Sequence, residues 1–160
     1  MPAPELVRLT ADDWQDFRRV RLDSLADSPQ AFGSRHADWI DAAEVRWRAR
    51  LIDVPLTIVA RSDGRFVGVV SGVSSGAHVE LISMWVAAEQ RGTGLAGRLI
   101  GAVVEWAASQ GLGTELMVRD DNARAIAAYE RAGFTDLGVP RDWPADEPRE
   151  RRMRYSPRKG

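Results

Sequence analysis

The sequence predicts one mixed α/β domain, of the α+β mixed-sheet type, covering residues 1–160. Segments with strand-like alternation stand beside segments with helical periodicity along most of the chain. Three strand candidates in the middle are joined by short turns, which predicts an antiparallel meander. A chain of 160 residues with 44% hydrophobic and 28% charged side chains also suits a single soluble globular domain with a sizeable core.

The first part of the chain predicts a short strand and two helices. Leu6–Leu9 is a short apolar segment, and Thr10 is a candidate N-cap for the helix that follows. Residues 27–34 form a loop in this interpretation. Asp38–Ile52 predicts the second helix, because apolar residues recur there at fourfold spacing (Trp39, Ala43, Trp47 and Leu51).

The meander follows directly. Its first strand is Leu56–Arg61, and the Asp-Gly pair in the turn at 62–65 is typical of a hairpin. Phe66–Val73 is the return strand. After a second glycine-containing turn, His78–Val86 is the third strand.

The last part of the chain predicts two more helices and three more strands. One helix begins in the glycine-rich stretch Glu89–Ala107 and ends at Gly111, and the other is capped at 120–122 and ends at Gly133. The strands are expected at Thr114–Val118, Phe134–Val139 and about Arg151–Tyr155. The predicted order of elements is therefore β-α-α-β-β-β-α-β-α-β-β.

Composition excludes several classes of site. The chain has no cysteine, so it can form neither a thiolate nucleophile nor a cysteine-based metal site. Its two histidines, His36 and His78, stand in unrelated contexts, so we expect no bound metal. A Schiff-base mechanism is disfavoured because Lys159, next to the C-terminus, is the one lysine.

The same inventory predicts where the protein works. A formal net charge of -1 gives no sign of a nucleic-acid partner or of binding to an anionic membrane. No apolar run approaches the length of a transmembrane helix, and no signal peptide is recognisable. We therefore expect no nucleic-acid or membrane partner, and a cytoplasmic location.

The glycines at 92, 94 and 97 come after a strand and at the start of a helix, an arrangement that predicts an anion site, because the first helix amides have no intrahelical partner. A tight turn without a ligand is the alternative. A Walker P-loop is excluded because the segment has no lysine. A Rossmann site is disfavoured because an antiparallel meander precedes the glycines and Gly111 stands about where the acidic residue is expected.

Two motifs carry a more specific resemblance. "RGTGLA" at 91–96 is similar to the Q/R-x-x-G-x-G/A motif of the GCN5-related N-acetyltransferases, the GNAT superfamily. "DNARAIAAYERAGF" at 121–134 is similar to a second signature of that family, N-x-x-A-x-x-x-Y-E-x-x-G-F. "LISMWV" at 81–86 resembles the family's fourth strand, and residues 147–155 resemble its final strand. The resemblance covers nearly the whole chain and implies a GNAT-like acyl-CoA N-acyltransferase fold.

By this resemblance, acetyl-coenzyme A is the cosubstrate. Its pantetheine arm would pair with main chain at a splay between the fourth and fifth strands, and its pyrophosphate would lie on loop amides. Asn122 would hydrogen-bond the coenzyme, and Tyr129 would lie near the sulfur. The other expected coenzyme-binding residues are Met84, Trp85, Val86, Arg91, Gly92, Thr93, Gly94, Leu95 and Ala96.

The helix spacing supports Asn122 and Tyr129 independently, because seven positions are close to two helical turns and place both on one face. A tyrosine hydroxyl, with an ordinary pKa of about 10, can donate a proton to a departing thiolate. The alternative role of Tyr129 is that of a core aromatic residue.

Glu80 is the candidate general base, at a position that matches the glutamate base of histone-modifying family members. Strand alternation predicts that it shares a largely apolar face with Ile82, Met84 and Val86, where its pKa would be raised. The alternatives are a solvated glutamate, His78 as the base, or no dedicated base.

The expected reaction is direct transfer of an acetyl group to the primary amine of a small molecule. The alternatives are a protein lysine or N-terminal acetyltransferase and a non-catalytic sensor that binds acyl-coenzyme A. The acceptor pocket is expected from segments 25–36 and 140–148, with candidate residues Phe32, His36, Trp39 and Trp143. The resemblance also implies a homodimer, and Gly97 and Gly101 are interpreted as sites of close packing against the sheet or the coenzyme.

Overall fold

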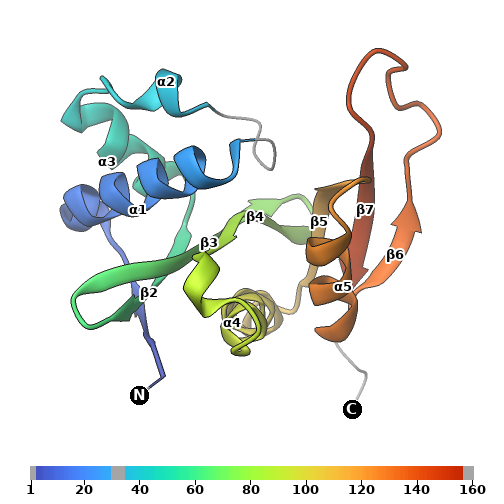
Figure 1. The fold of residues 1–160 in the computed structure, drawn as a ribbon. Helices are drawn as coiled ribbons and strands as arrows, with labels where there is room; N and C mark the ends of the chain where they lie inside the picture. Colours follow the sequence, from blue (N-terminus) through green and yellow to red (C-terminus); the bar gives the residue numbers. More distant parts are fainter. Residues whose placement is uncertain (1–2, 30–34, 157–160) are drawn as a thin grey trace.

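The computed structural model describes residues 3–29 and 35–156, and in these residues a seven-stranded mixed sheet carries helices on both faces (Figure 1). The strands are β1 (Glu5–Arg8), β2 (Leu56–Ser62), β3 (Arg65–Ser75), β4 (His78–Val86), β5 (Gly113–Arg119), β6 (Thr135–Gly138) and β7 (Glu150–Tyr155). The helices are α1 (Trp14–Asp27), α2 (His36–Trp39), α3 (Glu44–Asp53), α4 (Leu95–Ser109) and α5 (Ala123–Arg131), with 3-10 turns η1 (Ala11–Asp13) and η3 (Ala88–Gln90).

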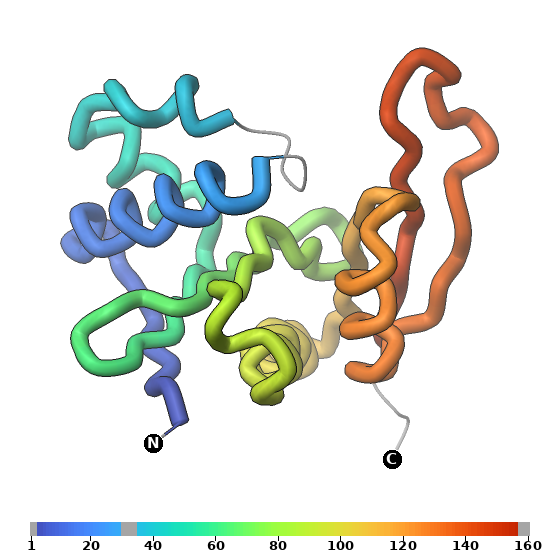
Figure 2. The backbone as a smooth tube through the Cα atoms, in the orientation of Figure 1, coloured from blue at the N-terminus to red at the C-terminus, as the bar shows by residue number. Residues whose placement is uncertain are grey.

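The strand order in the sheet is β1-β2-β3-β4-β5-β7-β6. The pair β4–β5 is parallel, whereas the other neighbouring pairs are antiparallel. The tube in Figure 2 follows the chain from the meander through α4 to the β6–β7 side of the sheet. The predicted mixed α/β class and the predicted antiparallel meander are confirmed.

The single helix expected over Asp38–Ile52 is wrong, because the chain forms two helices, α2 and α3, with a break between them. Two side chains donate hydrogen bonds to main-chain carbonyl groups at this break. The guanidinium of Arg46 donates to the Asp38 carbonyl at 2.6 Å, and the indole of Trp47 donates to the Ala42 carbonyl at 3.2 Å. The break is therefore stabilised by local side-chain hydrogen bonds to main-chain carbonyls, which the apolar periodicity does not reveal.

Helix α4 lies close against the sheet because β3 carries glycines beneath it. Leu95, Leu99 and Val103 are at most 1% exposed on the buried side of α4. A Cβ on Gly68 would lie 2.9 Å from a Leu99 methyl group, and a Cβ on Gly72 would lie 3.3 Å from Val103. This packing fixes where the N-terminus of α4 lies relative to the sheet. In the described part of the chain, no helix is long and apolar enough to cross a membrane.

A bulge interrupts β4 at Ser83, whose φ of 59° lies in the left-handed region. The pairing with β3 shifts there: Ile82 lies opposite Ser71, whereas Trp85 lies opposite Val69. Two residues of β4, Ser83 and Met84, thus face the single Val70 of β3, so strict side-chain alternation ends at the bulge.

The bulge overturns the prediction that Glu80, Ile82, Met84 and Val86 share one face. Val86 lies opposite Gly68, on the α4 side, and alternation places Met84 on that same side. Glu80 and Ile82 precede the bulge and face the α1–α3 side. Even-numbered residues of β4 therefore face the α1–α3 side before the bulge and the α4 side after it.

Strands β4 and β5 part soon after they meet. They pair only over His78–Glu80 and Gly113–Glu115, so Leu81–Val86 has no partner on β5. We call this segment of β4 the splay edge. Its main-chain groups on the β5 side are left for another partner, as the resemblance implied.

Candidate active site

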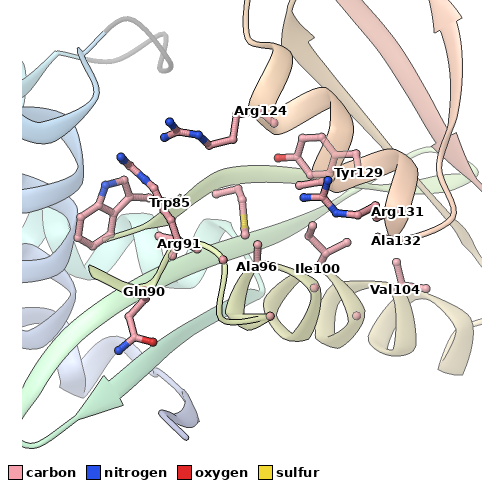
Figure 3. Close-up of a pocket in the computed structure, with 18 of the residues that line it drawn as sticks. Trp85, Gln90, Arg91, Ala96, Ile100, Val104, Arg124, Tyr129, Arg131 and Ala132 are labelled. Carbon is pink, nitrogen blue, oxygen red and sulfur yellow. The ribbon is translucent and has the colours of Figure 1, made fainter. Parts of the chain in front are cut away.

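A cavity of about 880 Å³ adjoins the splay edge, between α4 and α5 (Figure 3). Most of the expected site residues line it: Met84, Trp85, Val86, Arg91, Gly92, Gly94, Ala96, Asn122 and Tyr129. The structure thus brings three segments around one space. They are the end of β4, the loop at 91–94 that we call the glycine loop, and α5. Thr93, Leu95 and Glu80 are not among its lining residues.

The glycine loop exposes main-chain donors to this cavity. Gly92 and Gly94 have φ values of 79° and 88°, which a residue with a Cβ rarely adopts, and Gly94 is the N-cap of α4. The amides of Gly92 and of residues 94–97 have no hydrogen-bond partner among the described residues. These donors and the α4 dipole create positive potential at this wall.

Not every amide of the expected pyrophosphate loop is available. The amide of Arg91 donates to the Ala88 carbonyl at 3.2 Å, and Thr93 donates both its amide and its hydroxyl to the Gln90 carbonyl, at 3.4 and 2.6 Å. Leu95 contributes its amide, while its side chain lies in the core at 1% exposure. Thr93 therefore holds the turn, and its neighbours present the open donors.

Gly97 and Gly101 leave two positions without a side chain where α4 borders the cavity. A Cβ on either residue would meet nothing within 4 Å, and both residues line the cavity. The expectation that they pack closely against the sheet is therefore wrong. At these two positions α4 is smooth, whereas Ala96, Ile100 and Val104 extend from the helix toward the cavity (Figure 3).

Tyr129 lies on the α5 wall of the cavity. It is 7% exposed, and its ring centroid lies 5.8 Å from that of Phe134. Its hydroxyl points into the cavity (Figure 3) and makes no hydrogen bond to a described residue. Burial raises the pKa of this phenol well above its ordinary value, so the hydroxyl remains protonated in neutral solution and can donate a hydrogen bond.

Asn122 lies two turns before Tyr129 at the start of α5. Its side-chain oxygen accepts a hydrogen bond from the Ala125 amide at 3.2 Å and so caps the helix. Its side-chain nitrogen makes no hydrogen bond to a described residue and is left to donate into the cavity.

Two further basic residues on the cavity were not predicted from the sequence. Arg124 and Arg131 lie on α5 and, with Arg91 of the glycine loop, surround the cavity with three exposed guanidinium groups (Figure 3). Arg124 and Arg131 are seven positions apart, like Asn122 and Tyr129, so the same helical spacing could have identified them.

Asp27 connects the cavity to α1. Its carboxylate accepts hydrogen bonds from the Trp85 indole at 2.9 Å and from the Arg91 guanidinium at 3.3 Å. It is the last residue of α1, so one side chain joins that helix, the splay edge and the glycine loop. No sequence pattern pointed to it.

Glu80 lies in an ionic cluster rather than on the apolar face that was expected. Its carboxylate is 3.5 Å from the His78 imidazole, which lies 2.9 Å from Glu115. Burial acts to raise the pKa of Glu115, but its hydrogen bond from Arg154 and the charges of His78, Arg154 and Arg152 outweigh that effect and lower it. Within the described residues, no group of three or more His, Cys, Asp or Glu side chains could hold a metal ion.

The residues expected at the acceptor pocket do not line the cavity where the structure describes them. Phe32 lies outside the described residues. Trp39 packs on Trp47, with ring centroids 4.7 Å apart, as its core role requires. His36 opens α2, and Trp143 belongs to the β6–β7 connection; none of the described three lines the cavity.

The proteins that are similar to this chain agree with the geometry of the cavity. A family model described as "Acetyltransferase (GNAT) family" matches residues 8–134. The mycothiol acetyltransferase of Clavibacter michiganensis subsp. michiganensis (strain NCPPB 382) is 32% identical over 142 residues, which are 87% of this chain and 45% of that protein. The chain therefore spans less than half the length of the curated relatives it matches.

Solved structures show the same architecture. A nourseothricin acetyltransferase is 34% identical with a TM-score of 0.55, over 62% of this chain and 63% of that one. The PaiA N-acetyltransferase from Thermoplasma acidophilum, in complex with coenzyme A, has a TM-score of 0.74 over 97% of this chain and 99% of that one. At 14% identity, the second likeness speaks for the fold alone.

Proposed function

The chain belongs to the acetyltransferase (GNAT) family, and from this premise we propose that it transfers the acetyl group of acetyl-coenzyme A directly to a primary amine of a small molecule. The observation that carries the proposal is the cavity at the splay edge. It combines open main-chain donors, three guanidinium groups and a protonated tyrosine hydroxyl around one space.

The cavity suits the coenzyme in charge and shape. The open amides of Gly92 and residues 94–97 would hold the pyrophosphate, and Arg91, Arg124 and Arg131 would neutralise phosphate charge. The splay edge offers unpaired main-chain groups to the amides of the pantetheine arm. The smooth side of α4 leaves room for the arm to lie against the helix.

Acetyl transfer from the thioester requires a group that assists the leaving thiolate. The amine nitrogen attacks the thioester carbonyl carbon, the C–S bond breaks, and the electron pair leaves with the sulfur. Tyr129 would donate a hydrogen bond and then its proton to that sulfur, because its hydroxyl is protonated and points into the cavity. Asn122 would orient the coenzyme from the same face of α5.

The attacking amine must first lose a proton. Glu80 is the proposed base, acting through water because its carboxylate does not line the cavity, and His78 beside it is the second candidate. Both lie on the part of β4 that precedes the bulge, where even-numbered residues face the α1–α3 side. The acceptor would therefore approach from the α1–α3 side, and the coenzyme from the α4 side.

A small-molecule acceptor is favoured by the curated relatives named mycothiol acetyltransferase. The test is thiol release from acetyl-coenzyme A with a panel of small amines beside a lysine-containing peptide and a peptide with an unblocked N-terminus. Turnover with a small amine supports the proposal. Turnover with the peptides alone would instead establish a protein acetyltransferase, and coenzyme binding without any turnover would leave a sensor module.

A further inference from the structure

One carboxylate holds three side chains at the α1 end of the coenzyme cavity. The Oδ2 atom of Asp27 accepts hydrogen bonds from the Trp85 indole at 2.9 Å, the Ser28 hydroxyl at 3.2 Å and the Arg91 guanidinium at 3.3 Å. All three donor residues line the cavity, whereas Asp27 does not. Asp27 therefore lies behind the wall of the cavity and acts on a ligand through the residues that it holds.

The position of Asp27 in α1 does not stabilise the helix itself. Asp27 is the last residue of α1, so its negative charge lies at the negative end of the helix dipole. The last turn of α1, which the structure describes in full, has no basic residue to offset this charge. Its partners Trp85 and Arg91 stand 58 and 64 positions further along the chain. The contacts of Asp27 therefore serve β4 and the glycine loop rather than α1.

The Trp85 indole fixes the carboxylate in place. Trp85 is 8% exposed, and its N–H group donates to Asp27. A buried indole has one donor and little freedom to move, so this contact holds the carboxylate at a defined position. The splay edge has no β5 partner at Trp85, so the contact with α1 also secures the end of β4.

The contact with Arg91 is looser and leaves most of the guanidinium available. It uses one terminal nitrogen at 3.3 Å, which is longer than the about 2.7–2.9 Å typical of a charge-assisted hydrogen bond. The other two nitrogens of Arg91 make no hydrogen bond to a described residue. Figure 3 shows this guanidinium beside the Trp85 indole. The open N–H groups suit an oxyanion in the cavity, while Asp27 keeps the first nitrogen.

We propose that Asp27 is a positioning residue for coenzyme binding, because it holds the Arg91 guanidinium where the open N–H groups would meet the pyrophosphate. This inference rests on the proposed function and adds to it a residue outside the cavity. Without the carboxylate, the long Arg91 side chain would sample many rotamers in solvent, and ordering it on binding would cost conformational entropy. Asp27 lowers that cost before the coenzyme arrives.

Simple charge repulsion makes the opposite prediction. A carboxylate near a pyrophosphate repels it, so removal of Asp27 should tighten coenzyme binding if repulsion were its main effect. If Asp27 positions Arg91, removal of its contacts should weaken binding even though a negative charge is lost. The direction of the change in Kd therefore separates the two roles.

The experiment measures the Kd of coenzyme A by calorimetry for the wild type, Asp27→Ala, Asp27→Asn and Asp23→Ala. Asp27→Ala removes the charge and the contacts, whereas Asp27→Asn removes the charge and keeps an oxygen that can accept from Trp85 and Arg91. NMR of the Trp85 indole N–H group, assigned by its loss in Trp85→Phe, follows that contact. Asp23→Ala is the matched control, because Asp23 is exposed on the same helix one turn earlier.

We expect Asp27→Ala to weaken coenzyme A binding by about 3- to 10-fold, and Asp27→Asn to stay within about twofold of the wild type. In an Arg91→Met background, Asp27→Ala should no longer weaken binding, because Asp27 acts through Arg91. Asp23→Ala should match the wild type. The Asp27 side chain is 41% exposed, so the melting temperature of Asp27→Ala should stay close to that of the wild type.

Wild-type binding that Asp27→Ala leaves unchanged or tightens would overturn this inference alone. A loss of affinity that persists in full in the Arg91→Met background would also overturn it, because Asp27 would then only support the fold at Trp85. If the wild type does not bind coenzyme A at millimolar concentration, the proposed function fails and this inference fails with it.

Discussion

At Tyr129 the burial of the ring and the orientation of the hydroxyl have to be considered together. A purely structural tyrosine on an amphipathic helix would bury its ring and bond its hydroxyl to the protein or to bulk water. Here the ring is packed on Phe134, while the hydroxyl points into the cavity without a described partner. The raised pKa keeps the hydroxyl protonated, so it is available as a hydrogen-bond donor to a ligand.

Replacing Tyr129 by Phe should lower kcat by about 10²-fold, because the leaving thiolate loses its proton donor. The Kd for acetyl-coenzyme A, measured by calorimetry, should stay nearly the same, since the ring remains. Tyr155→Phe is the matched control, because it removes another hydroxyl from a residue that lines the cavity. A variant Tyr129→Phe with normal turnover would exclude this role.

The raised pKa of Tyr129 also has a consequence for pH. An unperturbed tyrosine would be half ionised at pH about 10, whereas the buried phenol keeps its proton there because its folded pKa is higher. The ratio of wild-type kcat to Tyr129→Phe kcat should therefore stay constant from neutral pH to about pH 10 and fall only above it. A ratio that halves near pH 10 would show that the phenol titrates at its ordinary pKa.

At the scale of elements, α4 and β4 decide what reaches the site. Helix α4 begins at a left-handed Gly94, presents open amides to the cavity and is smooth at Gly97 and Gly101. Strand β4 loses its β5 partner after Glu80 and turns its side chains over at Ser83. Helix α4 and strand β4 are thus both irregular at the place where the proposed coenzyme would lie.

Gly97→Leu tests the smooth side of α4. The residue is helical and open, so the folded chain should accept leucine without strain and gain about 1 kcal/mol of stability from the better helix former. The new side chain should fill the space over α4 and weaken acetyl-coenzyme A binding by at least about tenfold. Thermal melting and calorimetry measure the two effects.

The exposed Ala108 on the same helix provides the control, since Ala108→Leu adds bulk away from the cavity and should leave binding unchanged. Unimpaired coenzyme binding by Gly97→Leu would mean that the coenzyme does not lie over this part of α4.

Much of this arrangement could be predicted from the sequence, because local patterns determine it. The meander, the capped helix α5 and the glycine loop all have signals within a few residues, and the family resemblance drawn from two motifs is confirmed by the family model. The break between α2 and α3 and the bulge at Ser83 could not be predicted. The break depends on particular side-chain hydrogen bonds to the main chain, and the bulge depends on the register of β4 against β3. The place of Asp27 depends on a hydrogen bond between segments far apart in the sequence.

At the scale of the whole molecule, the sheet lies between the two approaches that the proposed function gives to its ligands. Helices α4 and α5 border the coenzyme cavity, and α1 and α3 cover the opposite side of the meander (Figure 1). At the splay edge, β4 has no β5 partner, so the sheet is open between the two sides. In the proposed function, this arrangement would let a thioester and an amine meet without sharing an entrance.

Acetyl-coenzyme A should stabilise the whole fold by mass action. At a ligand concentration of about 100 times Kd, the gain is about 2.7 kcal/mol, which raises the Tm of a chain of this size by about 5–10 °C. Thermal melting with and without the ligand measures it. The Gly97→Leu variant should show a much smaller shift at the same concentration, and an absent shift in the wild type at millimolar ligand would contradict the coenzyme assignment.

The splay edge has one more consequence, for how the protein behaves in the test tube. An unpaired strand edge is a template on which another extended chain can add hydrogen bonds, and here the partly exposed Ile82, Met84 and Val86 accompany it. A ligand lying along the edge would block such pairing. Concentrated protein should therefore scatter more light on storage without coenzyme A than with it, so the ligand would protect the protein against aggregation.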